Sequence, residues 1–178
     1  MTDPVLVYVA VGCLAGIFLL GAIDKLRHFT SFEAAAAAYA LMPSWLLRPF
    51  TVAFVLAEGL AAVLLLVPGN RALGAICALG VLLLASAGIA INLLRGRRNI
   101  DCGCGGLSGP PSELSGWLVL RNAGLMLLAV LVLIPVGGPQ RSLGWVDAVT
   151  FFGATLALLG LYFALSQLIE SHVRLQKI

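Results

Sequence analysis

The stretch Ala72–Leu94, ALGAICALGVLLLASAGIAINLL, runs without a charged residue and ends at the basic cluster Arg95-Gly96-Arg97-Arg98. An apolar stretch of this length can cross the roughly 30 Å hydrocarbon core of a bilayer. It does so as a helix, because a helix satisfies its own backbone hydrogen bonds in lipid. Positive charge directly after the stretch is typical of a helix end at a membrane surface. The stretch therefore predicts a transmembrane helix.

The composition extends this prediction to the whole chain. Of its 178 residues, 61% are hydrophobic and 11% are charged, whereas soluble domains are about half apolar and about one quarter charged. The net charge of +3 sits in short clusters beside apolar runs, a pattern that suits membrane orientation better than nucleic-acid binding. We expect a single integral membrane domain over residues 1–178. The start, Met1–Pro4, lacks the basic region of a secretory signal, so the first apolar run is expected to be retained.

Five apolar runs are long enough to span the membrane, which predicts an all-α, polytopic helical bundle. The expected spans are residues 5–23, 50–67, 72–94, 114–135 and 146–169. Between the first two, Thr30–Met42 is too short to span, and Thr30 with Glu33 has the spacing of a capping box. Pro43 should stop this helix, which we expect to lie at the membrane interface. Ser112 is the expected cap of the fourth span.

Basic residues alternate between the two ends of the expected spans. One set of connections and the C-terminal tail carry eight, namely Lys25, Arg27, Arg48, Arg95, Arg97, Arg98, Arg174 and Lys177. The other set carries Arg71 and Arg141. Because cytoplasmic loops are enriched in Lys and Arg, we expect the N-terminus outside and the C-terminus inside a bacterial inner membrane. The segment after the third span would then be cytoplasmic.

That segment holds Cys102 and Cys104, one residue apart in a polar, glycine-rich break. A disulfide that closes so small a ring departs from ideal geometry, and strained disulfides are the more reducible, catalytic or regulatory ones. The arginines upstream favour the thiolate, whereas Asp101 opposes it. The pattern predicts a redox-active pair. An inert turn remains the alternative, as does a pair of ligands to a soft metal.

The other two cysteines, Cys13 and Cys77, lie inside expected spans, so no complete metal site is expected. A buried cysteine usually behaves as a small hydrophobe, and we interpret both in this way. A relay that carries electrons outward through them stays open, although no motif supports it. Similarly, Gly12 and Gly16 have a spacing that permits close packing of helices.

Polar side chains inside the spans form a second candidate site. An intramembrane charge normally faces the bundle interior and finds a partner. Glu58 would pair with Arg121, or with Lys25 at the end of the first span. Arg121, a few turns after the cysteine pair and next to Asn122, could stabilise a thiolate or an anionic ligand. Alternatively, Arg121 snorkels to lipid phosphates and Glu58 is protonated. Asn92 is expected to serve in capping or in a hydrogen bond between helices.

Five elements of the chain together carry a family resemblance. They are Lys25-Leu26, the segment Phe32…Ala36…Tyr39…Leu41…Pro43, Glu58, Asp101-Cys102-Gly103-Cys104-x-Gly106, and Leu120-Arg121-Asn122. With them, the chain resembles the methylamine utilisation protein MauE family, which is related to the wider DoxX-like membrane proteins. It departs from the family pattern at Gly105, where Phe is common.

The resemblance implies four core spans of DoxX-like type, followed by a fifth. It also implies a role in maturing the disulfide-rich small subunit of methylamine dehydrogenase, together with a thioredoxin-like partner. In this hypothesis the chain is a thiol–disulfide oxidoreductase or assembly factor, with Cys102 and Cys104 as the redox pair. Arg121 helps electrostatically, and Lys25, Glu58 and Asn122 are accessory. The alternative is a non-enzymatic scaffold or small-molecule-binding bundle. No cofactor is identified and no quinone motif is visible.

Overall fold

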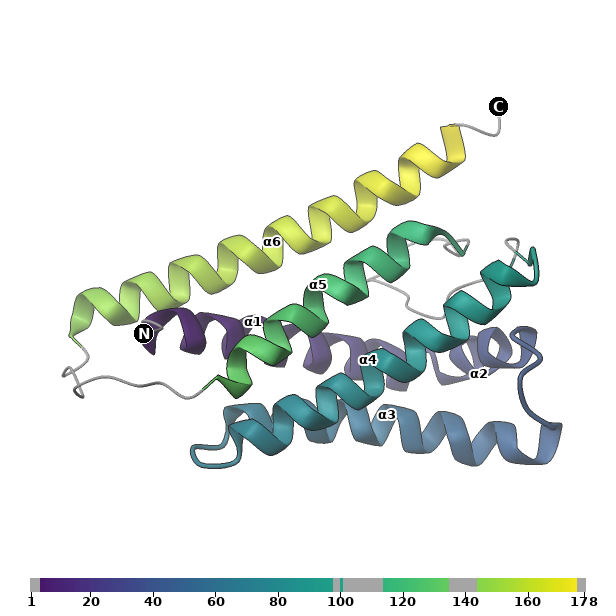
Figure 1. Cartoon of the computed structure of the whole chain (residues 1–178), viewed down its shortest axis with the longest axis horizontal. Helices are drawn as coiled ribbons and strands as arrows, with labels where there is room; N and C mark the ends of the chain where they lie inside the picture. Colours follow the sequence, from purple (N-terminus) through teal and green to yellow (C-terminus); the bar gives the residue numbers. More distant parts are fainter. Residues whose placement is uncertain (1–3, 98–99, 101–113, 135–143, 176–178) are drawn as a thin grey trace.

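Every element in the described part of the chain is a helix. The computed structural model describes residues 4–97, 100, 114–134 and 144–175, with side chains described as far as Leu168. The helices are α1 (Pro4–Arg27), α2 (Phe29–Ala38), α3 (Ser44–Leu66), α4 (Arg71–Leu94), α5 (Gly116–Leu133) and α6 (Trp145–Leu175), as Figure 1 shows.

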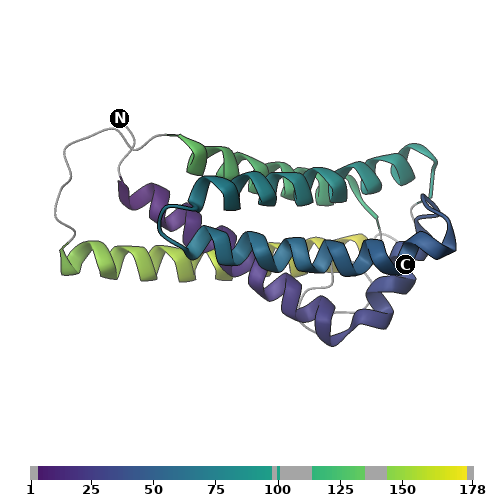
Figure 2. The ribbon, with the colours of Figure 1, turned by 90° about the horizontal axis from the view of Figure 1, so that it is seen from below.

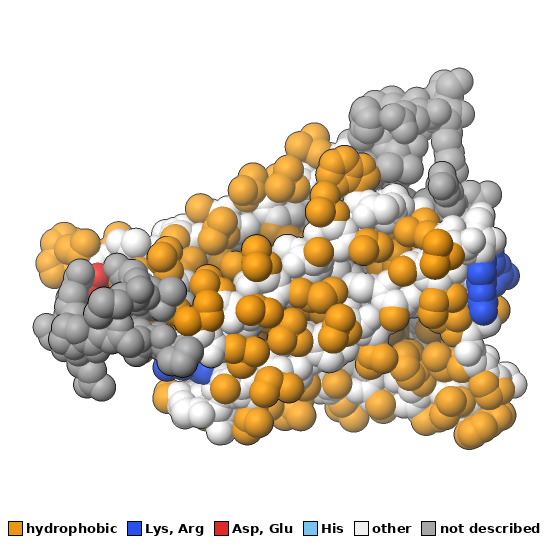
Figure 3. Space-filling model, viewed as in Figure 1, with side chains coloured by type: hydrophobic (Ala, Val, Ile, Leu, Met, Phe, Trp, Pro, Cys, Tyr) orange, Lys and Arg blue, Asp and Glu red, His pale blue; other side chains and the backbone are white. Residues whose placement is uncertain are grey.

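Five of the described helices, all but α2, are long and apolar enough to cross a membrane. Large apolar side chains cover the outer face of these helices, which in water would be costly to expose. In Figure 3 they extend along the visible face, while Lys and Arg gather near its ends. This arrangement indicates a multi-pass membrane protein and confirms the predicted fold class, including the short helix after the first span.

The core of the bundle consists of α1, α3, α4 and α5. Each packs against the next, with α5 returning to α1, while α6 packs on the outer side of α1 and α2 lies against α3 and α1. Successive long helices run in opposite directions (Figure 1), and α1 passes obliquely across the bundle (Figure 2). The C-terminal ends of α1 and α4 and the N-terminal end of α3 therefore meet at one end, which has Arg27, Arg48 and Arg95. Arg71 lies at the other.

Small residues bring the helices together at the end where α3 turns into α4. We call this region the packed half, and it includes Ala61, Ala62, Gly74, Ala75 and Ala78. The four alanines are each 0% exposed, and Gly74 is buried as well. A Cβ added to Gly74 would lie 2.6 Å from the backbone nitrogen of Leu65. The α3 and α4 backbones can approach this closely only because position 74 has no side chain.

Glycines also form the contact between α1 and α6. A Cβ on Gly12 would lie 3.1 Å from the ring of Phe151 and from the hydroxyl of Thr155. One on Gly16 would lie 3.1 Å from Leu159. The predicted role of these two glycines in close helix packing is confirmed, and the helix that they face is α6.

Two predicted helix starts differ from the structure. The helix α2 begins at Phe29, with His28 as its N-cap and no side-chain capping bond. Thr30 lies two residues past this N-cap, inside the helix, so the predicted capping box was wrong. The helix α3 begins at Ser44 instead of residue 50. Pro49 lies inside it as the sixth residue, so the helix continues past a residue that cannot donate an intrahelical hydrogen bond.

Helix ends differ as well. The helix α2 ends at Ala38, ahead of the predicted stop at Pro43, because the chain turns at Ala40, whose φ is 49°. The helix α1 continues through its charged residues to Arg27. The helix α5 begins at Gly116 with Ser115 as its N-cap. The predicted cap, Ser112, lies outside the described residues.

Candidate functional site

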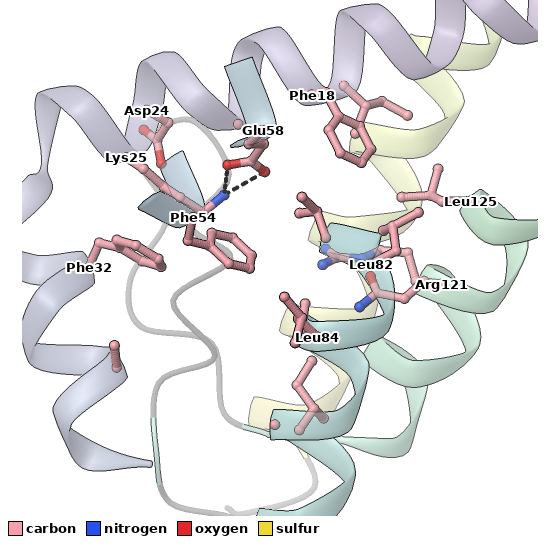
Figure 4. Close-up of a pocket in the computed structure, with 18 of the residues that line it drawn as sticks. Phe18, Asp24, Lys25, Phe32, Phe54, Glu58, Leu82, Leu84, Arg121 and Leu125 are labelled. Carbon is pink, nitrogen blue, oxygen red and sulfur yellow. Dashed lines mark hydrogen bonds and ion pairs between the residues drawn. The ribbon is translucent and has the colours of Figure 1, made fainter. Parts of the chain in front are cut away.

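A cavity of about 200 Å³ opens in the half of the bundle nearest α2, which we call the cavity half. All six helices contribute to its lining. Representative residues, one from each helix in chain order, are Lys25, Phe32, Glu58, Ala85, Arg121 and Tyr162. Figure 4 shows the charged side chains on two sides of this space, with apolar side chains between them. The polar residues proposed from the sequence therefore meet around one cavity.

An ion pair between Lys25 and Glu58 forms one side of the cavity. The Lys25 ammonium donates to both carboxylate oxygens of Glu58, at 2.9 and 2.8 Å, and each residue is only 9% exposed. A Cβ on Gly21 would lie 3.0 Å from Glu58 Oε1, so this glycine leaves room for the pair. Of the two partners considered for Glu58, the structure has Lys25.

Aromatic rings surround this pair. The Nζ atom of Lys25 lies 5.7 Å from the ring centroid of Phe32 and 5.9 Å from that of Phe54. Both distances are within the range of cation–π attraction, which is stronger where the cation is desolvated. Phe54 in turn packs against Phe32 and Phe50, with centroids 5.9 and 6.1 Å away. The rings and the carboxylate together compensate for burying the ammonium group.

Sequence reasoning missed Phe50 and Phe54. A signal for them existed, since residues 50, 54 and 58 are spaced four apart and share one face of a helix with Glu58. All three positions lie inside the predicted second span of residues 50–67, so this face could have been found from the sequence. Tyr162 was also missed, and its position beside the cavity depends on how α6 packs.

Arg121 lies on the side of the cavity opposite the ion pair (Figure 4). Its guanidinium carbon is 5.7 Å from the ring centroid of Tyr162 on α6. The next residue, Asn122, is 3% exposed and donates through Nδ2 to the Ser86 hydroxyl on α4, at 3.2 Å. Arg121 thus contributes to an interior surface, in agreement with the interpretation that it faces the bundle and in contrast to simple snorkelling.

The two cysteines in the spans behave as the sequence predicted. Cys13 is 2% exposed, with its Sγ 3.9 Å from the Thr155 carbonyl oxygen, and Cys77 Sγ lies 3.5 Å from that of Ala57. Both occupy small spaces between helices and are free thiols. In the described part of the chain, no group of three or more His, Cys, Asp or Glu could hold a metal ion.

Asn92 is fully buried and donates to the carbonyl of Gly88, at 3.1 Å. Both residues belong to α4, so this bond lies within the helix and does not link helices.

Cys102 and Cys104 lie outside the described residues, but both ends of their segment are described. The amide of Leu114 donates to the carbonyl of Ile100, at 3.2 Å, so the two ends are joined. Ile100 and Leu114 belong to one apolar cluster with Ile89 and Tyr39. Ile89 and Tyr39 also line the cavity. The segment that carries the cysteine pair thus begins and ends beside the cavity half.

Comparisons with known proteins match this chain to one family. Residues 3–135 match the family described as "Methylamine utilisation protein MauE". The "Methylamine utilization protein MauE" of Methylorubrum extorquens is 37% identical over 169 residues, which cover 92% of this chain and 88% of the relative. That of Paracoccus denitrificans is 38% identical over 149 residues, which cover 83% and 75%. That of Methylophilus methylotrophus is 35% identical over 141 residues, which cover 78% and 74%. No solved structure matches.

Proposed function

The chain belongs to the methylamine utilisation protein MauE family, and from this premise we propose that it is a membrane thiol–disulfide redox or assembly factor. Its client would be a disulfide-containing protein, such as the small subunit of methylamine dehydrogenase, reached through a thioredoxin-like partner. Cys102 and Cys104 are the proposed redox pair. Arg121 is the proposed positioning residue, which stabilises thiolate or anion charge near the pair.

One structural observation supports this proposal more than any other. The Ile100–Leu114 hydrogen bond joins the ends of the cysteine segment beside residues that also line the cavity with Arg121. Since Cys102 follows Ile100 by two residues, the covalent chain limits the distance between their Cα atoms to about 7 Å. A cation near a thiol favours the thiolate, which is the form that attacks and leaves in disulfide exchange.

The proposed exchange oxidises the partner and reduces this chain. A thiolate of the partner attacks one sulfur of the Cys102–Cys104 disulfide, which breaks that S–S bond and forms a mixed disulfide. The second thiolate of the partner then attacks the partner's sulfur in the mixed disulfide. The partner leaves with a new S–S bond, and Cys102 and Cys104 retain the two electrons and take up two protons as a dithiol.

The orientation belongs to the same proposal. We place the end with Arg27, Arg48, Arg95 and Arg97 on the cytoplasmic side of a bacterial inner membrane, with the N-terminus outside. The described cations at the two ends support this placement, because Arg71 is at the opposite end. The Lys25 ammonium is neutralised by Glu58 and adds little to the bias.

Thiol trapping in intact cells and inverted vesicles tests both the chemistry and the sidedness. We expect a thiol reagent to label Cys102 and Cys104 only after reduction, and a membrane-impermeant reagent to reach them only in inverted vesicles. Cys104→Ala cannot form the disulfide and should not oxidise the partner, but its Cys102 thiolate can attack the disulfide of the oxidised partner and should accumulate as a mixed disulfide. The matched control is Cys13→Ala/Cys77→Ala, which leaves the pair intact and should behave like the parent. Thiols that stay reduced under oxidising conditions, with a silent Cys102→Ser, would contradict the redox role.

The cavity favours a second candidate, a non-enzymatic scaffold or small-molecule-binding bundle. Its walls combine the Lys25–Glu58 pair with Arg121 in an otherwise apolar interior, as small-molecule sites commonly do. In that case, Arg121→Gln would abolish function in a client-maturation assay while Cys102→Ser left it unchanged. The redox role predicts loss in both variants.

A further inference from the structure

We propose that the cavity binds the ring of a membrane-soluble quinone. Binding is argued from the cavity itself, whereas its use as an electron acceptor rests on the redox role proposed above.

The size and surroundings of the cavity suit a single planar ring. Its volume of about 200 Å³ is below the roughly 300–1,000 Å³ of sites for drug-sized ligands, so one small ring fits and a whole lipid does not. Five helices long enough to span a membrane and the short helix α2 line it. Because lipid would surround these helices, a ligand would enter from the bilayer. Phe32, Phe54 and Tyr162 contribute flat faces to its walls, against which a conjugated ring can pack.

The polar groups of the cavity suit acceptors at two opposite ends of a ligand. On one side, the Lys25 ammonium has three N–H donors. It makes two hydrogen bonds to Glu58. On the other side, the Arg121 guanidinium carries five N–H donors and lines the same space (Figure 4). The two carbonyl oxygens of a quinone lie at opposite ends of its ring and accept hydrogen bonds.

Charge favours a neutral ligand over an anionic one. Besides the two cations, Glu58 and Asp24 line the cavity, and an oxygen of Asp24 near the end of α1 lies 3.3 Å from Nδ1 of His28, the N-cap of α2. Two cations and two carboxylates balance, so an anionic headgroup would gain little net attraction. A neutral molecule with strong hydrogen-bond acceptors avoids the cost of bringing a further charge into an apolar interior.

A quinone would complete the proposed exchange. After the partner has been oxidised, Cys102 and Cys104 are a dithiol, and a two-electron acceptor must restore their disulfide. The quinone accepts two electrons and two protons from the dithiol, an S–S bond forms, and the quinol returns to the bilayer. Tyr39 and Ile89 line the cavity and belong to the same apolar cluster as Ile100, so the cysteine segment begins next to the proposed site.

A binding experiment with cavity-filling variants tests the site. The full-length protein in lipid nanodiscs would be titrated with decylubiquinone, and binding would be measured by equilibrium dialysis against empty nanodiscs. Ala85→Phe fills the cavity from α4 and should weaken binding by about tenfold or more, since it removes the space for the ring. Ala87→Phe is the matched control, because Ala87 is exposed on the same helix and does not line the cavity. Equal binding by these two variants would overturn the proposal.

A second pair of variants tests the same cavity in case Ala85→Phe fails to fold. Ala36→Phe fills the cavity from α2, and Ala37→Phe places the same ring on the exposed side of that helix. Arg121→Gln removes the guanidinium without adding volume and should also weaken binding by about tenfold. Decanoate, an anionic amphiphile with a similar chain, should not compete. Competition by decanoate at equal concentration would overturn the assignment to a quinone.

The same assay separates this inference from the redox role. Cys102→Ser/Cys104→Ser should bind decylubiquinone like the parent and fail to reduce it. Binding without reduction by the parent dithiol would retain the site and reject its use as the electron acceptor. Disulfide exchange with the partner but no decylubiquinone binding would reject the site and retain the redox role.

Discussion

The packed half and the cavity half of the bundle use the same four core helices in opposite ways. In the packed half, Gly74 and the neighbouring alanines let α3 and α4 come into backbone contact. In the cavity half, the facing positions hold Phe54, Glu58 and Arg121, and a space of about 200 Å³ remains between the helices. Side-chain size therefore determines where these helices touch and where they leave room for a site.

The two halves also differ in what stabilises them. In the packed half, stability comes from dispersion contacts between closely spaced backbones, which are lost when added atoms push the helices apart. In the cavity half, it depends on pairing a buried ammonium with a carboxylate and aromatic rings. Such a pair is costly to break from one side, because the remaining charge stays buried. The following substitutions separate these two sources of stability.

The largest effect is expected in the cavity half, from Glu58→Leu. This change leaves the Lys25 ammonium buried without its carboxylate and should lower the free energy of unfolding by about 3–5 kcal/mol. Denaturant titration of the protein in detergent, followed by circular dichroism, would measure it. Lys25→Met/Glu58→Leu removes both charges and should recover most of the loss. If the double variant is as unstable as Glu58→Leu, charge pairing is not what stabilises this half.

A smaller loss is expected in the packed half, from Gly74→Ala. The added Cβ would lie 2.6 Å from a backbone atom, so α3 and α4 must separate, at a typical overpacking cost of about 1–3 kcal/mol. The same titration would measure the loss. Gly80→Ala on the same helix is the control, since a Cβ there meets nothing within 4 Å, and it should not destabilise the protein. Equal effects at both positions would show that close approach at Gly74 is unimportant.

The smallest effect is expected from Ser86→Ala. It removes the acceptor of the Asn122 amide between α4 and α5, and hydrogen bonds between membrane helices contribute about 0.6 kcal/mol on average. Thermal unfolding of parent and variant side by side would detect the change. Thr150→Ala serves for comparison, because that hydroxyl donates to the Val146 carbonyl within its own helix. A loss above that of Gly74→Ala would mean that polar contacts matter more than we infer.

Hydropathy was sufficient to predict the helices and their order. The apolar runs around Cys13 and Cys77 became α1 and α4, and both thiols are packed as small apolar groups. The polar residues of the candidate site were predicted, but its aromatic residues and the pairing of its charges were not. Glu58 was expected to meet Lys25 or Arg121, and its bond to Lys25 depends on how α1 and α3 are rotated about their axes. Helix ends were less predictable, because Pro49 and Ala40 act through local backbone geometry.

The amino-acid sequence by itself determined that this chain is an all-helical membrane bundle with intramembrane charges and a paired-cysteine segment. These are properties of single segments, since the length and polarity of each run decide whether it can lie in hydrocarbon. The tertiary structure alone decided that Lys25 neutralises Glu58, that Phe54 lies beside Lys25, and that Arg121, next to Tyr162, faces the same cavity. Such neighbours depend on the rotation and spacing of several helices, which the packing of small residues sets together.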